Sequence, residues 1–143
     1  MAIRIENREI IEEDIGTGKI RSIIEVLLKE ERKRLGTIEI VLLKDHQLLE
    51  INRNYLGHNY YTDVITFSYN RKDIVKGDVL ISVDSVKRNA IKFKQNLADE
   101  LVRVIIHGVL HIIGYTDENR ENREKMRIRE DEYLKKYKEE RNG

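Results

Sequence analysis

The chain has 143 residues, 27 Lys and Arg against 26 Asp and Glu, and a formal net charge of +1. This length suits a single domain over residues 1–143, and the 40% apolar and 37% charged composition excludes disordered and membrane-spanning classes. The absence of cysteine excludes a disulfide framework, a thiolate zinc finger, an iron–sulfur cluster and a cysteine nucleophile.

The longest apolar stretch, residues 104–113, is interrupted by His107 and His111 and is shorter than the roughly 20 residues that cross a bilayer. Residues 1–13 mix Arg and Glu with aliphatic residues, unlike a secretory signal. We therefore expect a cytoplasmic protein with no membrane partner.

In the first third of the chain, hydrophobic periodicity predicts strands and helices in alternation. In chain order we expect a strand at Ile3–Glu6, a helix over Thr17–Leu35 with Gly36 as its C-cap, a strand at Thr37–Leu43 and a short helix over residues 45–54. The first residue of that short helix, Asp45, can cap it.

The remaining elements follow a polar and aromatic loop at residues 54–62. Strands are expected at residues 64–67 and 79–83, on either side of a turn at 70–77, and helices at 85–94, 97–113 and 118–138. The helix at 97–113 is apolar almost all round, so we expect it in the core, ending at Gly114. The apolar seam of the last helix comprises Met126, Glu130, Tyr133, Leu134 and Tyr137. This order predicts an α+β domain with a four-stranded sheet packed with helices.

Two histidines, His107 and His111, lie four residues apart on the most apolar predicted helix. That spacing places both imidazoles on one helix face, close enough to bind one metal ion. A left-handed cap at Gly114 would turn the chain back and bring Asp117 to the same face. Two histidines and a carboxylate would then hold the ion on one side and leave a position for water.

The competing interpretation is that both histidines are core residues with hydrogen-bonded rings. Burying two imidazoles is costly unless each ring nitrogen has a partner, and one metal ion satisfies both rings together. We therefore favour the metal site, and the spacing specifies the ligands better than it specifies the metal.

The spacing of His107, His111 and Asp117 is similar to the zinc-binding helix of metzincin proteases, H-E-x-x-H-x-x-G-x-x-H. The Glu after the first His is the general base of those enzymes. Gly108 occupies that position here and cannot accept a proton, which argues against ordinary zinc-peptidase chemistry.

Three segments resemble the YbeY-type endoribonucleases, the rRNA maturation factors of bacteria. They are His107-Gly-x-Leu-His111-x-x-Gly114-Tyr115, Thr62-Asp-Val-Ile-Thr-Phe67 and Gly77-Asp-Val-Leu-Ile-Ser82. The resemblance implies a zincin-like fold with a mixed sheet and a central metal-binding helix. It also implies a zinc-dependent endoribonuclease acting on single-stranded RNA, in maturation of the small-subunit rRNA 3′ end and in ribosome quality control. RNA and the ribosome or its small subunit are the implied partners.

The sequence departs from the family pattern at two places. The family usually reads Gly-Tyr-Asp-His where this chain has Gly-Tyr-Thr116-Asp117, so a carboxylate replaces the third histidine. A carboxylate shifts the preference of the site towards harder ions. Leu56 stands where the family tends to carry an arginine, with Arg53 one helical turn earlier.

The clearest local basic excess lies between residues 87 and 103, and residues 86–98 contain no acid. It comprises Lys87, Arg88, Lys92, Lys94 and Arg103. These residues can contact the RNA backbone, or they can simply form a solvated helix face.

Two other functions remain open from the sequence. One is a zinc peptidase, and the other is a ribosome-associated binding factor with a structural metal. A closed structural site would use four protein ligands, whereas three are apparent, which favours a reactive ion. Residues 16–19, Gly-Thr-Gly-Lys, end like a P-loop, but Glu13 and Ile20 stand where glycine and Ser or Thr are needed, so we expect no nucleotide cofactor.

Overall fold

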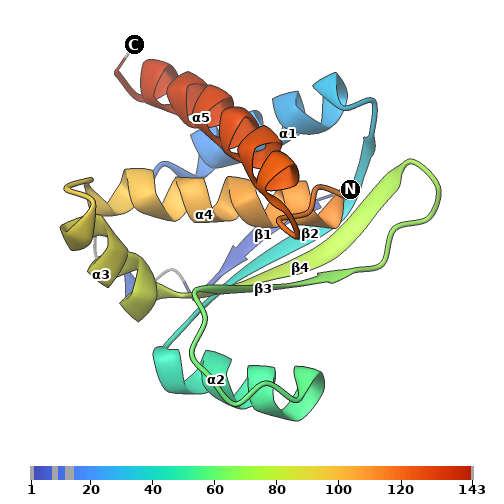
Figure 1. Ribbon diagram of the computed structural model, residues 1–143. Coiled ribbons are helices and arrows are strands. Elements are labelled where there is room, and N and C mark those ends of the chain that lie inside the picture. Colours follow the sequence, from blue (N-terminus) through green and yellow to red (C-terminus); the bar gives the residue numbers. More distant parts are fainter. Residues whose placement is uncertain (1, 8–9, 12–14, 143) are drawn as a thin grey trace.

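The computed structural model describes residues 2–7, 10–11 and 15–142 (Figure 1). The elements in chain order are β1 (Ala2–Glu6), α1 (Thr17–Glu30), β2 (Arg34–Leu43), α2 (Asp45–Leu56), β3 (Val64–Ser68), β4 (Ile74–Ser82), α3 (Val83–Lys92), α4 (Leu97–Ile112) and α5 (Arg120–Asn142). The strands form one sheet in the order β1-β2-β4-β3, in which β1, β2 and β4 are parallel and β3 is antiparallel to β4. The predicted α+β class with a four-stranded mixed sheet is confirmed.

The sheet separates two unequal cores. Figure 1 shows α2 on one face and α1, α4 and α5 on the other. Side chains of strand β2 point alternately to the two faces of the sheet. Ile38 and Ile40 enter the main core, whereas Leu43 packs with Leu48 of α2 in the smaller one. The short edge strand β3 therefore has helix α4 on one side and helix α2 on the other.

Helix α4 occupies the centre of the main core, as its apolar sequence predicts, and two glycines bring it unusually close to the sheet. A Cβ at Gly108 would lie 2.6 Å from Cγ1 of Val79, and one at Gly77 would lie 2.8 Å from Cδ1 of Ile112. Any larger side chain at either position would push the helix and the sheet apart. No helix among the described residues is both long and apolar enough to cross a membrane.

Helix α5 crosses α4 and also packs against α1, and its predicted seam is buried. Two tyrosine hydroxyls connect it to earlier segments. Tyr133 donates to Oε1 of Glu30 at 2.8 Å, and Tyr137 donates to the carbonyl of Ile15 at 3.0 Å. These bonds satisfy hydroxyl groups that would otherwise be costly to bury.

Helix α1 ends at Glu30, earlier than the predicted Leu35, and Gly36 is not its cap. Arg32 adopts the left-handed conformation instead, with φ 58°, and the Lys33 amide donates to the Leu28 carbonyl as in a Schellman cap. Gly36 lies in β2, where a Cβ would be 2.8 Å from the Val75 carbonyl oxygen. A non-glycine cap leaves no sequence signal, which explains the wrong boundary.

Two further local predictions were wrong. Strand β4 begins at Ile74 rather than at residue 79, so Gly77 belongs to a strand and not to the preceding turn. Lys44 is the N-cap of α2, and its amide donates to Oε1 of Gln47, whereas Asp45 uses its carboxylate for contacts with β4 and α3.

Candidate metal centre

Helix α4 places His107 and His111 on one face, one turn apart. Their Nε2 atoms are 3.1 Å apart, and the two ring planes are inclined by 77°. Both side chains are about a quarter exposed, so the pair lies at the edge of the core and not inside it. Their Nε2 atoms are therefore not sealed inside the core, and the metal site stays the prediction that we favour over two core histidines.

The turn after α4 returns the chain to this face. The amide of Tyr115 donates to the Leu110 carbonyl and that of Gly114 to the His111 carbonyl, which is the bonding pattern of a Schellman cap. Gly114 has the positive φ, 110°, that this reversal requires, as predicted. As a result, Oδ2 of Asp117 lies 3.5 Å from Nε2 of His111.

The three side chains lie close enough together to hold one metal ion. One ligand atom from each of His107, His111 and Asp117 lies within 4.8 Å of the others. Bonds of about 2.0–2.1 Å to tetrahedral zinc separate neighbouring ligand atoms by about 3.3 Å. The observed separations of 3.1 and 3.5 Å bracket that value. Two of the three separations thus match such an ion, and the third, between the ligand atoms of His107 and Asp117, is at most 4.8 Å.

Glu130, on the buried seam of α5, contacts the opposite side of the His107 ring. Its Oε2 lies 2.8 Å from Nδ1 of His107, so Nδ1–H donates to the carboxylate and Nε2 keeps its lone pair for a metal. Sequence analysis placed Glu130 only in the apolar seam. A carboxylate at a buried seam position was the available signal, because such a group needs a partner.

The two ring pKa values move in opposite directions. Burial lowers the pKa of His107, but the hydrogen bond and charge of Glu130, with contributions from Asp63 and Asp117, raise it overall. Burial and the neighbouring charge of His107 lower the pKa of His111 despite the carboxylate of Asp117. Since His111 favours its neutral form, it can offer a lone pair near neutral pH.

The three candidate ligands border a pocket of about 330 Å³, which we call the metal pocket. Residues of β3, the end of α2 and the following loop complete its wall. Leu56, at the position where the resemblance leads one to expect arginine, lines this pocket. Arg53 does not line it and donates to Oδ1 of Asn59 at 2.9 Å. His58 and Tyr60, whose rings stack at 5.2 Å, line the pocket from the loop.

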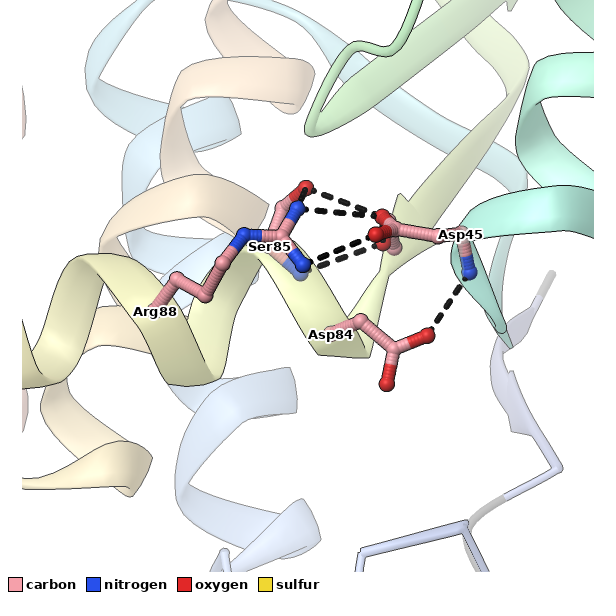
Figure 2. A network of polar contacts seen from close by, with 5 residues as sticks. Asp45, Asp84, Ser85 and Arg88 are labelled. Carbon is pink, nitrogen blue, oxygen red and sulfur yellow. Dashed lines mark hydrogen bonds and ion pairs between the residues drawn. The ribbon is translucent and has the colours of Figure 1, made fainter.

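A polar network fixes the start of α2 to β4 and α3 (Figure 2). Arg88 of α3 donates to Oδ2 of Asp45 at 2.8 Å, and the Asp45 amide donates to Oδ2 of Asp84 at 2.8 Å. Ser82 and Ser85 also donate to Asp45. The Arg88 guanidinium is the main cause that lowers the pKa of Asp45. This network orients the helix whose far end forms part of the metal pocket.

The predicted basic residues divide into two groups. Lys87, Lys92 and Lys94 are exposed, and they form no ion pair within the described part of the chain. Arg88 is paired with Asp45 as above, and Arg103 of α4 contacts Glu130 at 3.5 Å and Asp131 at 2.7 Å. The two arginines therefore have structural partners that the sequence did not reveal.

A second group of cations lies at the start of α5. A hollow there is lined by Arg120, Arg123, Glu124 and Arg127, and Arg123 donates to the backbone carbonyl of Asp117. The alternating charges of residues 120–129 are a pattern that predicts i,i+4 ion pairs along the helix. Only Lys125–Glu121 forms such an i,i+4 pair among the described residues of this stretch. The signal that sequence reasoning missed was the three- and four-residue spacing of Arg120, Arg123 and Arg127, which puts these arginines on one face of α5.

Comparison with known proteins places this geometry in a family. Residues 2–138 match the family model described as Endoribonuclease YbeY. Proteins of that name from Bacteroides thetaiotaomicron and Chlorobaculum tepidum are 40% and 43% identical, over 94% and 80% of this chain and 98% and 84% of their own. The solution structure of TM1509 from Thermotoga maritima superposes with a TM-score of 0.69 at 26% identity, covering 99% of this chain and 92% of that one. The chain belongs to the Endoribonuclease YbeY family.

Proposed function

We propose that this protein is a metal-dependent endoribonuclease that cleaves single-stranded RNA during maturation of the small-subunit rRNA 3′ end. Its substrate is presented on the ribosome or its small subunit, where the same cleavage serves quality control. The observation that carries the proposal is the convergence of two histidines and one carboxylate at the wall of an open pocket, in a chain of this family.

In this proposal one Zn²⁺ is held by His107, His111 and Asp117. When bound, such an ion polarises a phosphate oxygen and lowers the pKa of a coordinated water. Glu130 keeps a proton on Nδ1 of His107, which fixes the tautomer that presents Nε2. The carboxylate of Asp117 adds a negative charge to the ligand set, so the site also suits harder ions than three histidines would.

We propose that the exposed cations of α3 and of the turn after it bind the RNA backbone. Lys87, Lys92 and Lys94 contact phosphates directly, and Arg88 and Arg103 contribute positive charge from their paired positions. Tyr60, 57% exposed at the rim of the pocket, offers a ring on which an unpaired base can stack.

The test is cleavage of a labelled single-stranded RNA by wild type, His111→Ala and His46→Ala. His46 is exposed on α2 and serves as the matched control. We expect wild type and His46→Ala to cleave and His111→Ala to lose both cleavage and stoichiometric zinc. Equal cleavage by all three would refute the assignment of the site. The product ends identify the nucleophile, because a 2′,3′-cyclic phosphate indicates the 2′-hydroxyl and a 5′-phosphate indicates water.

The position of Gly108 argues against the zinc-peptidase alternative. This residue faces the sheet, where a Cβ would meet Cγ1 of Val79 at 2.6 Å. A glutamate at this position could not act as a base without displacing α4. The binding-factor alternative predicts ribosome binding that persists in His111→Ala together with no cleavage by wild type, so the same variants test it.

A further inference from the structure

A second pocket, of about 570 Å³, adjoins the metal pocket between α3, α4 and α5. Asp63 and His107 line both pockets, so the His107–Glu130 pair stands at their boundary. A strand of RNA bound at the metal pocket therefore has this second pocket as its immediate neighbour. The proposed function gives it no role.

Glu100 is the unusual residue of the second pocket. Only 5% of this residue is exposed, yet its carboxylate forms no hydrogen bond or ion pair within the described part of the chain. Every fully buried side-chain nitrogen or oxygen of the described residues has a hydrogen-bond partner. The unpartnered carboxylate oxygens of Glu100 must therefore be reachable from the pocket that this residue lines.

A nearly buried carboxyl without a partner is costly, and a ligand that donates a hydrogen bond would offset that cost. Burial raises the pKa of Glu100, which reflects this unsatisfied state. The charge of Arg103 lies near enough to lower the pKa of Glu100 and so opposes the effect of burial. Its guanidinium, however, donates its hydrogen bonds to Glu130 and Asp131 and not to Glu100.

The other walls of the pocket suit a flat, polar-edged ligand. Phe93, just after α3, is 56% exposed and lines the pocket with an aromatic ring, and the ammonium of Lys92 lies 5.4 Å from its centroid. Asn89 and Gln95, whose side chains carry amide groups, also line it. An exposed ring beside hydrogen-bonding groups is how proteins bind unpaired RNA bases.

We propose that the second pocket receives an unpaired base of the RNA and selects bases that carry an amino group, with Phe93 stacking on the base and Glu100 accepting from the amino group. This inference rests on the proposed function. Adenine, cytosine and guanine each have an exocyclic amino donor. Uracil has no exocyclic amino group: it carries carbonyl oxygens at those positions, which a carboxylate repels, and the one donor on its pairing edge is the ring N3–H between them.

The position of the pocket relative to the metal ligands limits which nucleotide it reads. Glu100 and His107 are seven residues apart on α4, a rise of about 10.5 Å. The base in the second pocket therefore belongs to a nucleotide close to the scissile phosphate along the strand, and not to the nucleotide whose phosphate is bound at the metal pocket. The pocket would determine where along a single strand the enzyme cleaves.

The test measures binding of fluorescent A8, C8 and U8 RNA by anisotropy, in the His111→Ala background so that the RNA stays intact. We expect A8 and C8 to bind about tenfold more tightly than U8, as expected for one hydrogen bond to a charged group. Adding Glu100→Gln, which preserves the volume but adds a donor, should bring the three RNAs within about twofold of one another. Glu25→Gln, exposed on α1, is the matched control and should preserve the preference.

A second variant covers the case in which Glu100→Gln does not fold. Phe93→Ala changes an exposed side chain and should weaken binding of all three RNAs alike. Equal affinity for U8 in the parent protein, or an unchanged preference after Glu100→Gln, would overturn the proposal. If Glu100→Gln instead abolished binding of a lysine-rich peptide and left the RNA preference unchanged, the pocket would belong to a basic protein partner, which also overturns it. Failure of the metal-loaded wild type to cleave any RNA would instead refute the proposed function.

Discussion

The close approach of α4 to the sheet at Gly108 makes a quantitative prediction for Gly108→Ala. The added Cβ would lie 2.6 Å from Cγ1 of Val79, 3.3 Å from its Cγ2 and 3.4 Å from Cγ2 of Thr66. Val79 is fully buried, so its side chain has no free space into which to move. The helix or the strand must therefore shift.

The expected loss in the free energy of unfolding is the difference between two opposing effects. Overpacking a well-packed core costs about 1–3 kcal/mol, and a Cβ only 2.6 Å from a buried side chain puts this site in the upper part of that range, about 2–3 kcal/mol. Replacing a mid-helix glycine by alanine returns about 1 kcal/mol. The net prediction for Gly108→Ala is a loss of about 1–2 kcal/mol in the free energy of unfolding, or about 3–7 °C in Tm for a chain of this length. Gly18→Ala in α1 is the matched control, because its Cβ would have no neighbour within 4 Å, and it should be neutral or stabilising.

The assay is reversible urea unfolding of both alanine variants, Val79→Ala and the double variant Gly108→Ala/Val79→Ala. Val79→Ala removes the methyl groups that block the new Cβ, so the two changes should couple by about 1 kcal/mol or more in the favourable direction. A Gly108→Ala protein as stable as wild type, or additive losses in the double variant, would refute the close contact as the reason for glycine at this position.

Three further predictions concern the site and its surroundings. Glu130→Ala should lower zinc affinity about 10–100-fold in a chelator competition, because His107 loses the acceptor that fixes its tautomer, with Glu130→Gln intermediate; unchanged affinity for both variants would contradict this. Arg88 lowers the pKa of Asp45 in the folded state, so the pair stabilises the protein at pH values above the unfolded pKa of about 3.9, and that contribution disappears as pH falls through the folded pKa. Asp45→Asn should therefore be less stable than wild type at pH 7, and this difference in the free energy of unfolding should vanish in acid. A difference that does not change with pH would argue against the ion pair. Replacing Lys87, Lys92 and Lys94 by Ser should reduce the slope of log K against log salt for single-stranded RNA by about 0.7 for each phosphate that is no longer neutralised, and an unchanged slope would refute their proposed contacts with the RNA backbone.

The sequence alone determined the elements whose signals are local. Period-two and helical apolar patterns predicted the strands and helices, and the four-residue spacing of His107 and His111 predicted a shared helix face. Gly114 predicted the reversal that brings Asp117 beside His111, because a left-handed cap is strongly favoured at glycine. All of these depend on interactions between residues a few positions apart.

Only the tertiary structure decided the features that depend on distant segments. Nothing near Glu130 in the sequence shows that it meets His107, since the contact arises from the way α5 crosses α4. Likewise, Gly108 is a glycine because Val79 of a different element lies against it. Glu100 is exceptional because the packing of α3, α4 and α5 leaves its carboxylate without a partner among the described residues. Such packing is set by side-chain volumes across the whole core and not by local pattern.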